Sequence, residues 1–401
     1  MIAALMTRHS AQARLAASFS FLLASASLLA QQPWVGPRFA GMAGAQTASA
    51  NDALALWANP AGLGIEPRLE VNLFGSPVAT DRGHFVSAVN VLSVLDPNNL
   101  TPPQAVAALA ALTNLNRPGV GLVASGVAGF VVAEKGLAIG VGDVAYAAVY
   151  PNVDLAHISP ANFSQNTSGV NSIGLEAREL RIGYAYPLYG RTVLVGAAVR
   201  YIWGRTYYNH TSVFDLKQDN LGSIIVESLK QNEKGTKAFT FDVGAIVNVL
   251  STVKVGIVSS ALTNPKFDVK QSTVNPTLLG APTFVRLPRT VRAGAAVTPL
   301  SALTVAVDYD LVASDTLLPG GKSRQLSGGF EVKVPLFSLR GGTWRDFEAP
   351  DPHWSYSVGF GLNLAVLSID AAVVLSQEGG LKLKAENRRD LGAAVGARFR
   401  F

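Results

Sequence analysis

The sequence has no cysteine, few charges and no long apolar run beyond its first thirty residues. Zero Cys among 401 residues excludes disulfides, so packing or a membrane must hold the folded chain together. Charged residues make up 15% of the chain and form no basic run of the kind that binds nucleic acid. The longest later apolar run, Val120 to Ala133, contains three glycines and stops at a Glu-Lys pair, which argues against a membrane-spanning helix.

The first thirty residues have the pattern of a secretory signal peptide. Two arginines, Arg8 and Arg14, precede an apolar run from Leu15 to Leu29, and small residues at Ala24 to Ala26 or at Ala30 offer cleavage points. The apolar run is too short to span a bilayer comfortably. We therefore expect this leader, residues 1–30, to be removed on export.

A twofold alternation of apolar and polar side chains runs through the rest of the chain. From Trp354 to Leu364, six apolar residues occupy every second position, with Ser, Gly or Asn between them. A period of two is that of a β-strand and excludes an amphipathic helix. Each such segment has about ten residues, the length that a tilted strand needs to cross hydrocarbon. The same alternation occurs at residues 367–375, 303–311, 239–248 and 192–204.

The connections between these segments are alternately short and long. Short turns such as Glu134 to Gly136 and Leu250 to Thr252 alternate with long loops such as Pro151 to Ser172 and Tyr207 to Lys237. Outer-membrane barrels have this asymmetry, with the short turns in the periplasm. We predict an all-β fold, a transmembrane antiparallel β-barrel of about 14 strands over residues 67–401.

The sequence offers two candidate segments for the first strand of this barrel. Counting back from Phe401 makes Phe85 to Leu95 the fourteenth strand and leaves Leu69 to Gly75 as a fifteenth candidate. A barrel with both ends in the periplasm needs an even number of strands. We therefore assign fourteen, and interpret the Leu69 segment as attached to a plug unless one strand was split in two. Helices are expected within two long loops, at Pro102 to Leu115 and Asn220 to Lys230.

The chain ends on an alternating strand with a free aromatic terminus. Phe399 and Phe401 lie on one face of this strand, and Arg398 and Arg400 lie on the other. A terminal aromatic residue on such a strand resembles the signal read by the outer-membrane barrel-assembly machinery. That machinery and outer-membrane lipid are therefore expected partners.

Between the leader and the barrel lies a compact element, FAGMAGAQTASANDALALWANPAGLG, at Phe39 to Gly64. Gly41 and Gly44 allow a tight backbone. Pro60 moves Asn59 out of the helical region, so a short helix ends there. Such a compact element is small enough to fit inside a larger structure.

The pattern GMAGA, followed by small residues and then NPAGL, resembles the N-terminal hatch of the FadL family of outer-membrane transporters for fatty acids and other hydrophobic molecules. It is similar also to the related TraF-like and PorV-like proteins, and the Gly-rich strands and modest length are more like the TraF-like group. The resemblance implies a hatch over residues 31–66, inside the lumen, with the motif Gly41, Gly44, Asn59, Pro60, Ala61 and Gly62.

The resemblance also implies a function. We expect a passive channel in the outer membrane of a Gram-negative-type bacterium, taking up small hydrophobic molecules such as long-chain fatty acids as the hatch moves. In that family the molecule then leaves sideways through a gap at a kinked strand. The alternative is a barrel that anchors or scaffolds a secretion or conjugation apparatus and binds a protein through its loops. An outer-membrane enzyme is a more distant third interpretation.

Gly142 and Asp143 mark a change of phase in one predicted strand. The apolar positions run from Leu137 to Val141 at every second residue and restart one residue out of step at Val144. A slip of one residue predicts a β-bulge. Such a bulge would either form the kink for lateral exit or only bend the barrel wall.

Charged residues of both signs fall on the phase of the strands that faces away from lipid. Pairing across the lumen is the expected arrangement, and it would fix the hatch and narrow the water path. A substrate-binding role for particular members is the alternative. The predicted lumen charges are Arg181, Arg200, Asp242, Arg292, Asp308, Asp310 and Asp370.

Motifs for enzymatic chemistry are weak. Gly140 to Ala145 matches the dinucleotide pattern G-x-G-x-x-A but continues as strand and opens no helix. The histidines lack metal-ligand spacing, and no G-x-S-x-G nucleophile motif is present. Asp308 and Asp310 lie two apart on one strand face, where ion pairing suits them better than acid-base catalysis. We therefore expect no catalytic residue, metal or cofactor.

Overall fold

Fourteen of the described strands close into one antiparallel β-barrel. A computed structural model describes residues 34–65, 68–159, 161–213, 233–272, 275, 278, 280–376 and 389–401. The predicted leader and the predicted helix at Asn220 to Lys230 lie outside these residues. The fourteen barrel strands are β1 (Glu70–Arg82), β2 (Gly121–Glu134), β3 (Leu137–Asn152), β4 (Gly169–Leu188), β5 (Val193–Ser212), β6 (Lys234–Leu250), β7 (Val253–Ser260), β10 (Thr290–Leu300), β11 (Leu303–Asp310), β14 (Gln325–Lys333), β15 (Phe337–Asp346), β16 (Trp354–Asn363), β17 (Leu367–Ser376) and β18 (Asp390–Arg400).

Each strand pairs antiparallel with its neighbours in sequence, and β1 pairs with both β2 and β18, which closes the barrel. The predicted fold class and strand number are confirmed. Two small hairpins lie in long connections, β8 (Lys266–Asp268) with β9 (Phe284–Arg286) and β12 (Ser314–Asp315) with β13 (Lys322–Ser323). The helical segments are α2 (Gly36–Ala40), α3 (Ala55–Ala58), α4 (Phe85–Ser93) and α5 (Pro102–Leu115), with 3-10 turns η1 (Pro60–Gly64), η2 (Phe163–Gln165) and η3 (Tyr189–Arg191).

The predicted identity of the first strand is wrong. The segment from Phe85 forms helix α4, and the Leu69 segment supplies β1, a full member of the barrel. The reason is the spacing of the buried side chains in α4, which are Phe85, Ala88, Val89 and Leu92. This i, i+3, i+4, i+7 pattern is the period of a helix.

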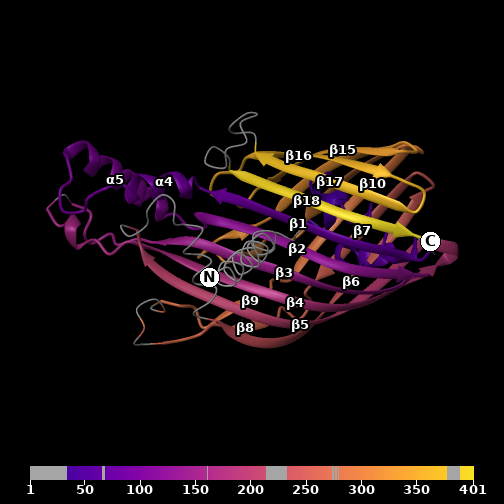
Figure 1. Ribbon diagram of the computed structural model, residues 1–401, viewed down its shortest axis with the longest axis horizontal. Helices are drawn as coiled ribbons and strands as arrows, with labels where there is room; N and C mark the ends of the chain where they lie inside the picture. The colour runs from indigo at the N-terminus through magenta and orange to yellow at the C-terminus, as the bar shows by residue number, and fades with distance from the viewer. Residues whose placement is uncertain are drawn as a thin grey trace, which may run out of the picture.

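The predicted helix at Pro102–Leu115 is present as α5. Thr101 and Gln104 form a capping box at its start, with Gln104 Oε1 accepting from the Thr101 N–H at 2.9 Å. Helices α4 and α5 pack together beyond one end of the barrel, and the C-terminus lies at the other end (Figure 1). Among the described residues, no helix is long and apolar enough to cross a membrane.

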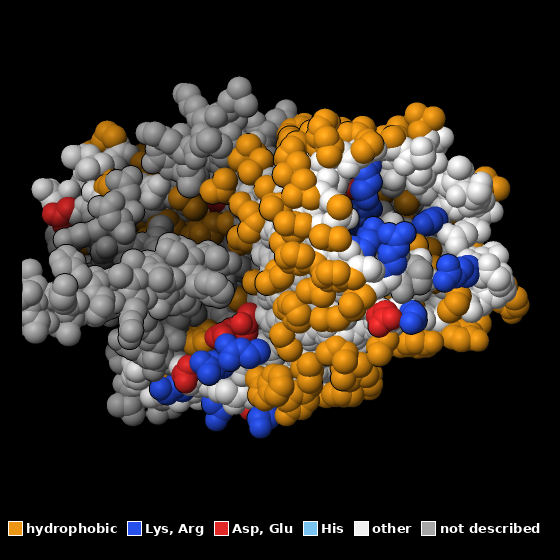
Figure 2. Space-filling model, turned by 45° about the vertical axis from the view of Figure 1, so that its right-hand side comes forward, with side chains coloured by type: hydrophobic (Ala, Val, Ile, Leu, Met, Phe, Trp, Pro, Cys, Tyr) orange, Lys and Arg blue, Asp and Glu red, His pale blue; other side chains and the backbone are white. Residues whose placement is uncertain are grey.

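The outer wall of the barrel is apolar. On β3, Leu137, Ile139 and Val141 are each about half exposed, and the residues between them face the lumen. Figure 2 shows hydrophobic side chains spread over the wall in this way. Further towards the long loops the outward position is occupied by Asp143, whose carboxylate lies 3.0 Å from Arg178 Nε on β4. This exposed ion pair marks where the apolar surface ends on that side.

Candidate functional site

Residues 34–65, which we call the hatch, fill the lumen in the half of the barrel nearer the short turns. From Trp34 to Leu63 every residue is buried except Asn51, which is half-buried. Gly44 has φ +84°, in the left-handed region that favours glycine, and the Trp34 ring lies where a side chain at Gly44 would be. Gly41 packs against Gly359 of β16, so both predicted glycines lie at close approaches.

The Asn59-Pro60-Ala61 motif is the point where the hatch contacts β5 to β7. Asn59 is extended (φ −152°, ψ 107°), as expected of a residue before proline, and Pro60 begins η1. The Asn59 side chain accepts from Ala61 N at 3.2 Å and donates to Thr47 O at 2.8 Å. A Cβ on Gly62 would overlap the Ala50 carbonyl. The motif therefore holds two separate turns of the hatch together.

Glycines of the barrel wall face the hatch and allow it to dock. A Cβ on Gly244 of β6 would overlap Asn59 Oδ1, and a Cβ on Gly196 of β5 would overlap the backbone of Pro60. A Cβ on Gly256 of β7 would lie 2.7 Å from Thr47 O. Wall glycines with such contacts to the hatch are Gly140, Gly183, Gly196, Gly244, Gly256, Gly294, Gly329, Gly342, Gly359 and Gly396. Much of the high glycine content therefore shapes the lumen around the hatch.

All seven predicted lumen charges are buried inside the barrel. One group of four lies on β4 to β6. Arg181 contacts Glu179 at 2.7 Å and Asp242 at 3.1 Å, and Arg200 contacts the same two acids at 2.5 and 3.2 Å. The Arg181 guanidinium also lies 5.1 Å from the ring centre of Trp57 in α3. A cation is attracted to the face of an aromatic ring, so this group of charges also helps to hold the hatch.

A second group joins the hatch to the opposite wall. Arg38 of the hatch contacts Asp52 at 3.2 Å and Glu331 of β14 at 2.9 Å. Arg340 of β15 contacts Glu331 at 2.8 Å and Asp370 of β17 at 2.6 Å. Removing one partner of such a pair costs about 3–5 kcal/mol, because the other charge is left buried without compensation.

Asp308 and Asp310 belong to the third group. Asp310 accepts from Arg292 Nε at 2.7 Å. Asp308 Oδ2 accepts from the backbone N–H groups of Gln46 and Thr47, each at 2.9 Å. The two carboxylates therefore have separate partners, and one of them binds the hatch directly.

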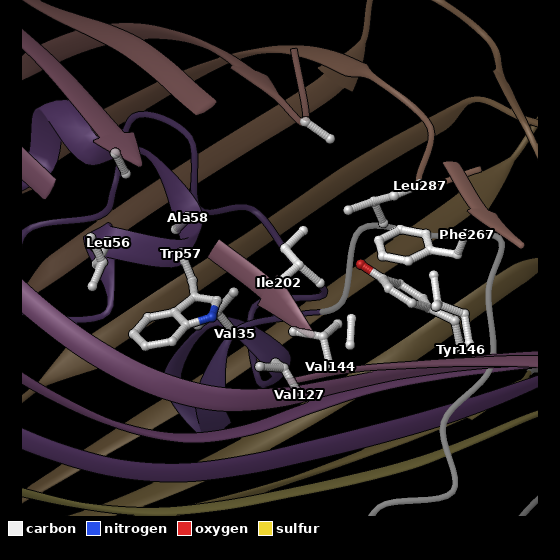
Figure 3. Packing of buried hydrophobic residues seen from close by; sticks show 14 of the residues in the cluster. Val35, Leu56, Trp57, Ala58, Val127, Val144, Tyr146, Ile202, Phe267 and Leu287 are labelled. Carbon is white, nitrogen blue, oxygen red and sulfur yellow. The ribbon is translucent and has the colours of Figure 1, made fainter. Parts of the chain in front are cut away.

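Between the hatch and the long loops the lumen is apolar on the β2 to β5 side. Val144 and Tyr146 of β3 and Ile202 of β5 are buried there together with Trp57 of the hatch. Phe267 of β8, in the β8–β9 hairpin, reaches into the lumen towards these residues. Figure 3 shows it beside Tyr146. We call this group of packed apolar side chains the apolar chamber. Its other wall residues include Val123, Val127, Ile173, Leu175 and Tyr208, and the hairpin side adds Val269, Leu278, Val285 and Leu287.

The β-bulge predicted at Gly142 and Asp143 is absent. Residues of β3 pair in unbroken register with β2 and β4, including Gly142 with Gly129 and Asp143 with Arg178. The apparent slip arises because Val144 and the apolar residues after it face the apolar chamber, whereas those before Gly142 face lipid. The strand does not change register; the lumen changes from polar to apolar.

The rim of the barrel at the long-loop end is held by a further set of charges. His353, just before β16, contacts Asp390 at 2.5 Å between Nε2 and Oδ2. Burial lowers the pKa of His353, but the hydrogen bond and charge of Asp390 outweigh this, and the pKa lies above its ordinary value of 6.5. Arg82 of β1 contacts Asp346 of β15 at 3.0 Å. The connection from β15 to β16 is therefore attached to β18 through Asp390 and to β1 through Arg82.

Sequence reasoning missed Glu179, Arg38 and the β8–β9 hairpin. Glu179 lies two residues from Arg181 on the same strand face, so the alternation that located Arg181 also indicated it. Arg38 lies in a helix without periodic signal, and only the docked hatch brings it to Glu331. Phe267 lies in a three-residue strand, too short for any period to be recognised. Among the described residues, no group of three or more His, Asp or Glu could hold a metal ion.

A family model described as "F plasmid transfer operon, TraF, protein" matches residues 89–310, more than half of the sequence. The chain belongs to this TraF family. The TraF-like resemblance noted in the sequence is thereby confirmed. No curated protein matches the chain in sequence.

Solved structures similar to this TraF-family chain include two toluene transporters and a FadL homologue. The toluene transporter TbuX of Ralstonia pickettii has a TM-score of 0.54 at 16% identity, covering 91% of this chain and 98% of its own. The toluene transporter TodX of Pseudomonas putida has a TM-score of 0.53 at 16% identity, covering 94% and 99%. A FadL homologue of Pseudomonas aeruginosa has a TM-score of 0.53 at 12% identity, covering 94% and 100%. At these identities the likeness concerns the fold.

Proposed function

We propose that this protein is a channel of the bacterial outer membrane that takes up small hydrophobic molecules passively. The observation that carries the proposal is the apolar chamber between the hatch and the β8–β9 hairpin. Interior positions of a membrane barrel are ordinarily polar. Here Val144, Tyr146 and Ile202 face inwards at positions where the alternation would otherwise put polar residues.

The chamber would favour apolar ligands by desolvation. Each methylene group removed from water contributes about 0.8 kcal/mol, so a small hydrocarbon gains several-fold in affinity for every added carbon. The proteins of similar fold are described as toluene transporters and a FadL homologue, and this agreement with an apolar lumen supports the proposal.

Two movable parts bound the chamber in this proposal. The β8–β9 hairpin covers it from the long-loop end, where the ring of Phe267 lies against Gly204 of β5. The hatch covers it from the short-turn end, held by Arg38 and Asp308. A ligand would enter when the hairpin swings away and leave after the hatch contacts loosen. The continuous register of β3 offers no lateral gap at Gly142.

A substitution at the hairpin tests this function. Phe267→Ala removes a fully buried ring that fastens the hairpin, and the loss is about 3–5 kcal/mol for a buried Phe. Phe284→Ala removes a ring from the same hairpin that is 37% exposed and serves as the matched control. We expect faster toluene uptake into proteoliposomes with Phe267→Ala and wild-type uptake with Phe284→Ala. If wild-type protein carries no more toluene than empty liposomes, the channel function is rejected.

A second candidate function is a scaffold for a transfer or secretion apparatus. It is favoured by the family description and by α4 and α5, which carry no charged residue and leave apolar side chains exposed beyond the barrel. Val106 of α5 is 70% exposed and Val94, just after α4, is 69% exposed. The double variant Val94→Ser with Val106→Ser would abolish cross-linking to a partner protein in this case, while toluene uptake would stay unchanged.

A further inference from the structure

Six buried side chains on the wall opposite the apolar chamber carry polar atoms without a hydrogen-bond partner. Among the residues that the structure describes, nothing bonds Asp308 Oδ1, Ser327 Oγ, Arg292 Nη1 or either amide atom of Gln325. The indole Nε1 atoms of Trp34 and Trp344 are likewise unpartnered. None of the six residues is more than 2% exposed. We call them the polar cluster: Trp34, Arg292, Asp308, Gln325, Ser327 and Trp344.

The members of the polar cluster are neighbours in space. Asp308 of β11 pairs directly with Ser327 of β14, and Ser327 pairs directly with Trp344 of β15. Residues opposite each other in this way have Cβ atoms about 5 Å apart on the same face. Gln325 is two residues from Ser327 and therefore on that face as well.

Arg292 and Trp34 complete the cluster from two sides. Arg292 and the backbone N–H of Gln325 both bond Asp310, at 2.7 and 3.0 Å. Trp34 of the hatch packs edge to face on Trp344, with ring centres 5.5 Å apart. The polar cluster thus spans four adjacent strands and the first residue of the hatch.

Buried polar atoms in folded proteins almost always have partners, so a concentration of unpartnered ones indicates a place where water or a ligand binds. The cluster offers donors from Arg292, Trp34 and Trp344, acceptors from Asp308, and both kinds from Gln325 and Ser327. A hydroxyl or amide group, which donates and accepts at once, matches this set.

The charge of the cluster selects against anions. Arg292 is the only cation of the cluster, and it faces two carboxylates, Asp308 and Asp310. The cluster and the neighbouring Asp310 together carry a charge of −1 when both acids are ionised, which disfavours a carboxylate ligand. A neutral hydrogen-bonding group fits better.

The polar cluster and the apolar chamber follow each other along the hatch. Trp34 belongs to the polar cluster, and the next residue, Val35, belongs to the chamber.

We propose that the lumen binds amphiphilic molecules with a neutral hydroxyl or amide group, and that the polar cluster recognises this group. The inference rests on the proposed uptake function and narrows its substrate class. Plain hydrocarbons would bind through the apolar chamber alone, and carboxylates would be disfavoured by Asp308 and Asp310.

The test compares p-cresol with toluene, which differ by one hydroxyl group, and with 4-methylbenzoate. Binding to the detergent-solubilised full chain is measured by titration, with indole N–H signals of the five Trp residues followed by NMR. We expect p-cresol to bind about tenfold more tightly than toluene, as for one added hydrogen bond. It should also shift the indole signals of Trp34 and Trp344, and 4-methylbenzoate should bind more weakly than p-cresol.

A double variant removes two polar atoms of the cluster and keeps an aromatic ring at position 344. Ser327→Ala with Trp344→Phe should bring the ratio of p-cresol to toluene affinity close to one while toluene affinity is kept. The matched controls are Ser338→Ala, a buried lumen position at the short-turn end of β15, and Trp203→Phe, which faces outwards and is 40% exposed. Both controls should keep the tenfold ratio.

The outcomes separate this inference from the proposed function. Equal affinity for p-cresol and toluene, a ratio that survives in the double variant, or tighter binding of 4-methylbenzoate would overturn the hydroxyl or amide site while leaving uptake of hydrophobic molecules in place. If neither toluene nor p-cresol binds, the uptake function itself fails, and this inference fails with it.

Discussion

One oxygen of Asp308 accepts both the backbone N–H and the hydroxyl of Thr47, at 2.9 and 2.7 Å, and so joins a barrel strand to the hatch. The same oxygen also accepts from Gln46 N at 2.9 Å. Three donors on one carboxylate oxygen make this the most concentrated hydrogen bonding between hatch and wall on the β11 side.

Asp308→Asn should loosen the hatch. The neutral amide still accepts but loses the charge that strengthens three hydrogen bonds, a loss of about 1–3 kcal/mol. We expect more frequent openings in single-channel recordings, by about tenfold for each 1.4 kcal/mol. Asp143→Asn on the outer wall is the control and should leave the recordings unchanged. Equal opening frequencies in the two variants would contradict a hatch-holding role for Asp308.

The contact between Gly244 and Asn59 allows a second test, because β6 contains its own control. Gly244→Ala forces a Cβ into Asn59 Oδ1, and overpacking of this kind costs about 1–3 kcal/mol. Gly235→Ala on the same strand meets nothing within 4 Å. We expect the first variant to expose the hatch to protease and the second to behave as wild type. Equal protection of both would mean that the hatch docks without contact at Gly244.

The contact between His353 and Asp390 at the rim predicts that the stability of the folded protein depends on pH. Its pKa is raised above 6.5 in the folded protein, so the Asp390 contact stabilises fully below pH 6.5 and its contribution is lost as pH rises through the folded pKa. His353→Gln should therefore lower the melting temperature at pH 5.5 and change it little at pH 9. His210→Gln on β5 is the control, because the His210 ring contacts the neutral amide of Asn171, at 2.7 Å. A melting difference that is constant with pH would exclude titration of His353 as the cause.

The terminal Phe401 is proposed as part of the assembly signal together with Phe399, because an aromatic that is 66% exposed contributes little packing. Deleting Phe401 should slow insertion by the barrel-assembly machinery several-fold and leave the melting temperature of the folded barrel nearly unchanged. Phe337→Ala removes another half-exposed aromatic, at the start of β15, and should not slow insertion. A deletion that inserts at the wild-type rate would reject the signal.

The alternation predicted the strands because each barrel residue faces either lipid or lumen, and that choice repeats every two residues. It succeeded best from β14 to β18, where lumen positions are mostly small or polar, as at Ser355 and Ser357. It misjudged β3, because Val144 is apolar for a reason other than lipid contact. It also misjudged Phe85, since a short apolar segment fits periods of two and of 3.6 almost equally.

The sequence by itself determined that this chain forms a barrel with an apolar exterior and charges inside, because those properties depend on local period and composition. Only the tertiary structure decided which charges pair, as Arg38 with Glu331, and that Phe267 reaches the chamber from a distant loop. These contacts join residues far apart in the chain, and their geometry depends on strand register and on the shape that wall glycines leave for the hatch. No local pattern encodes those distances.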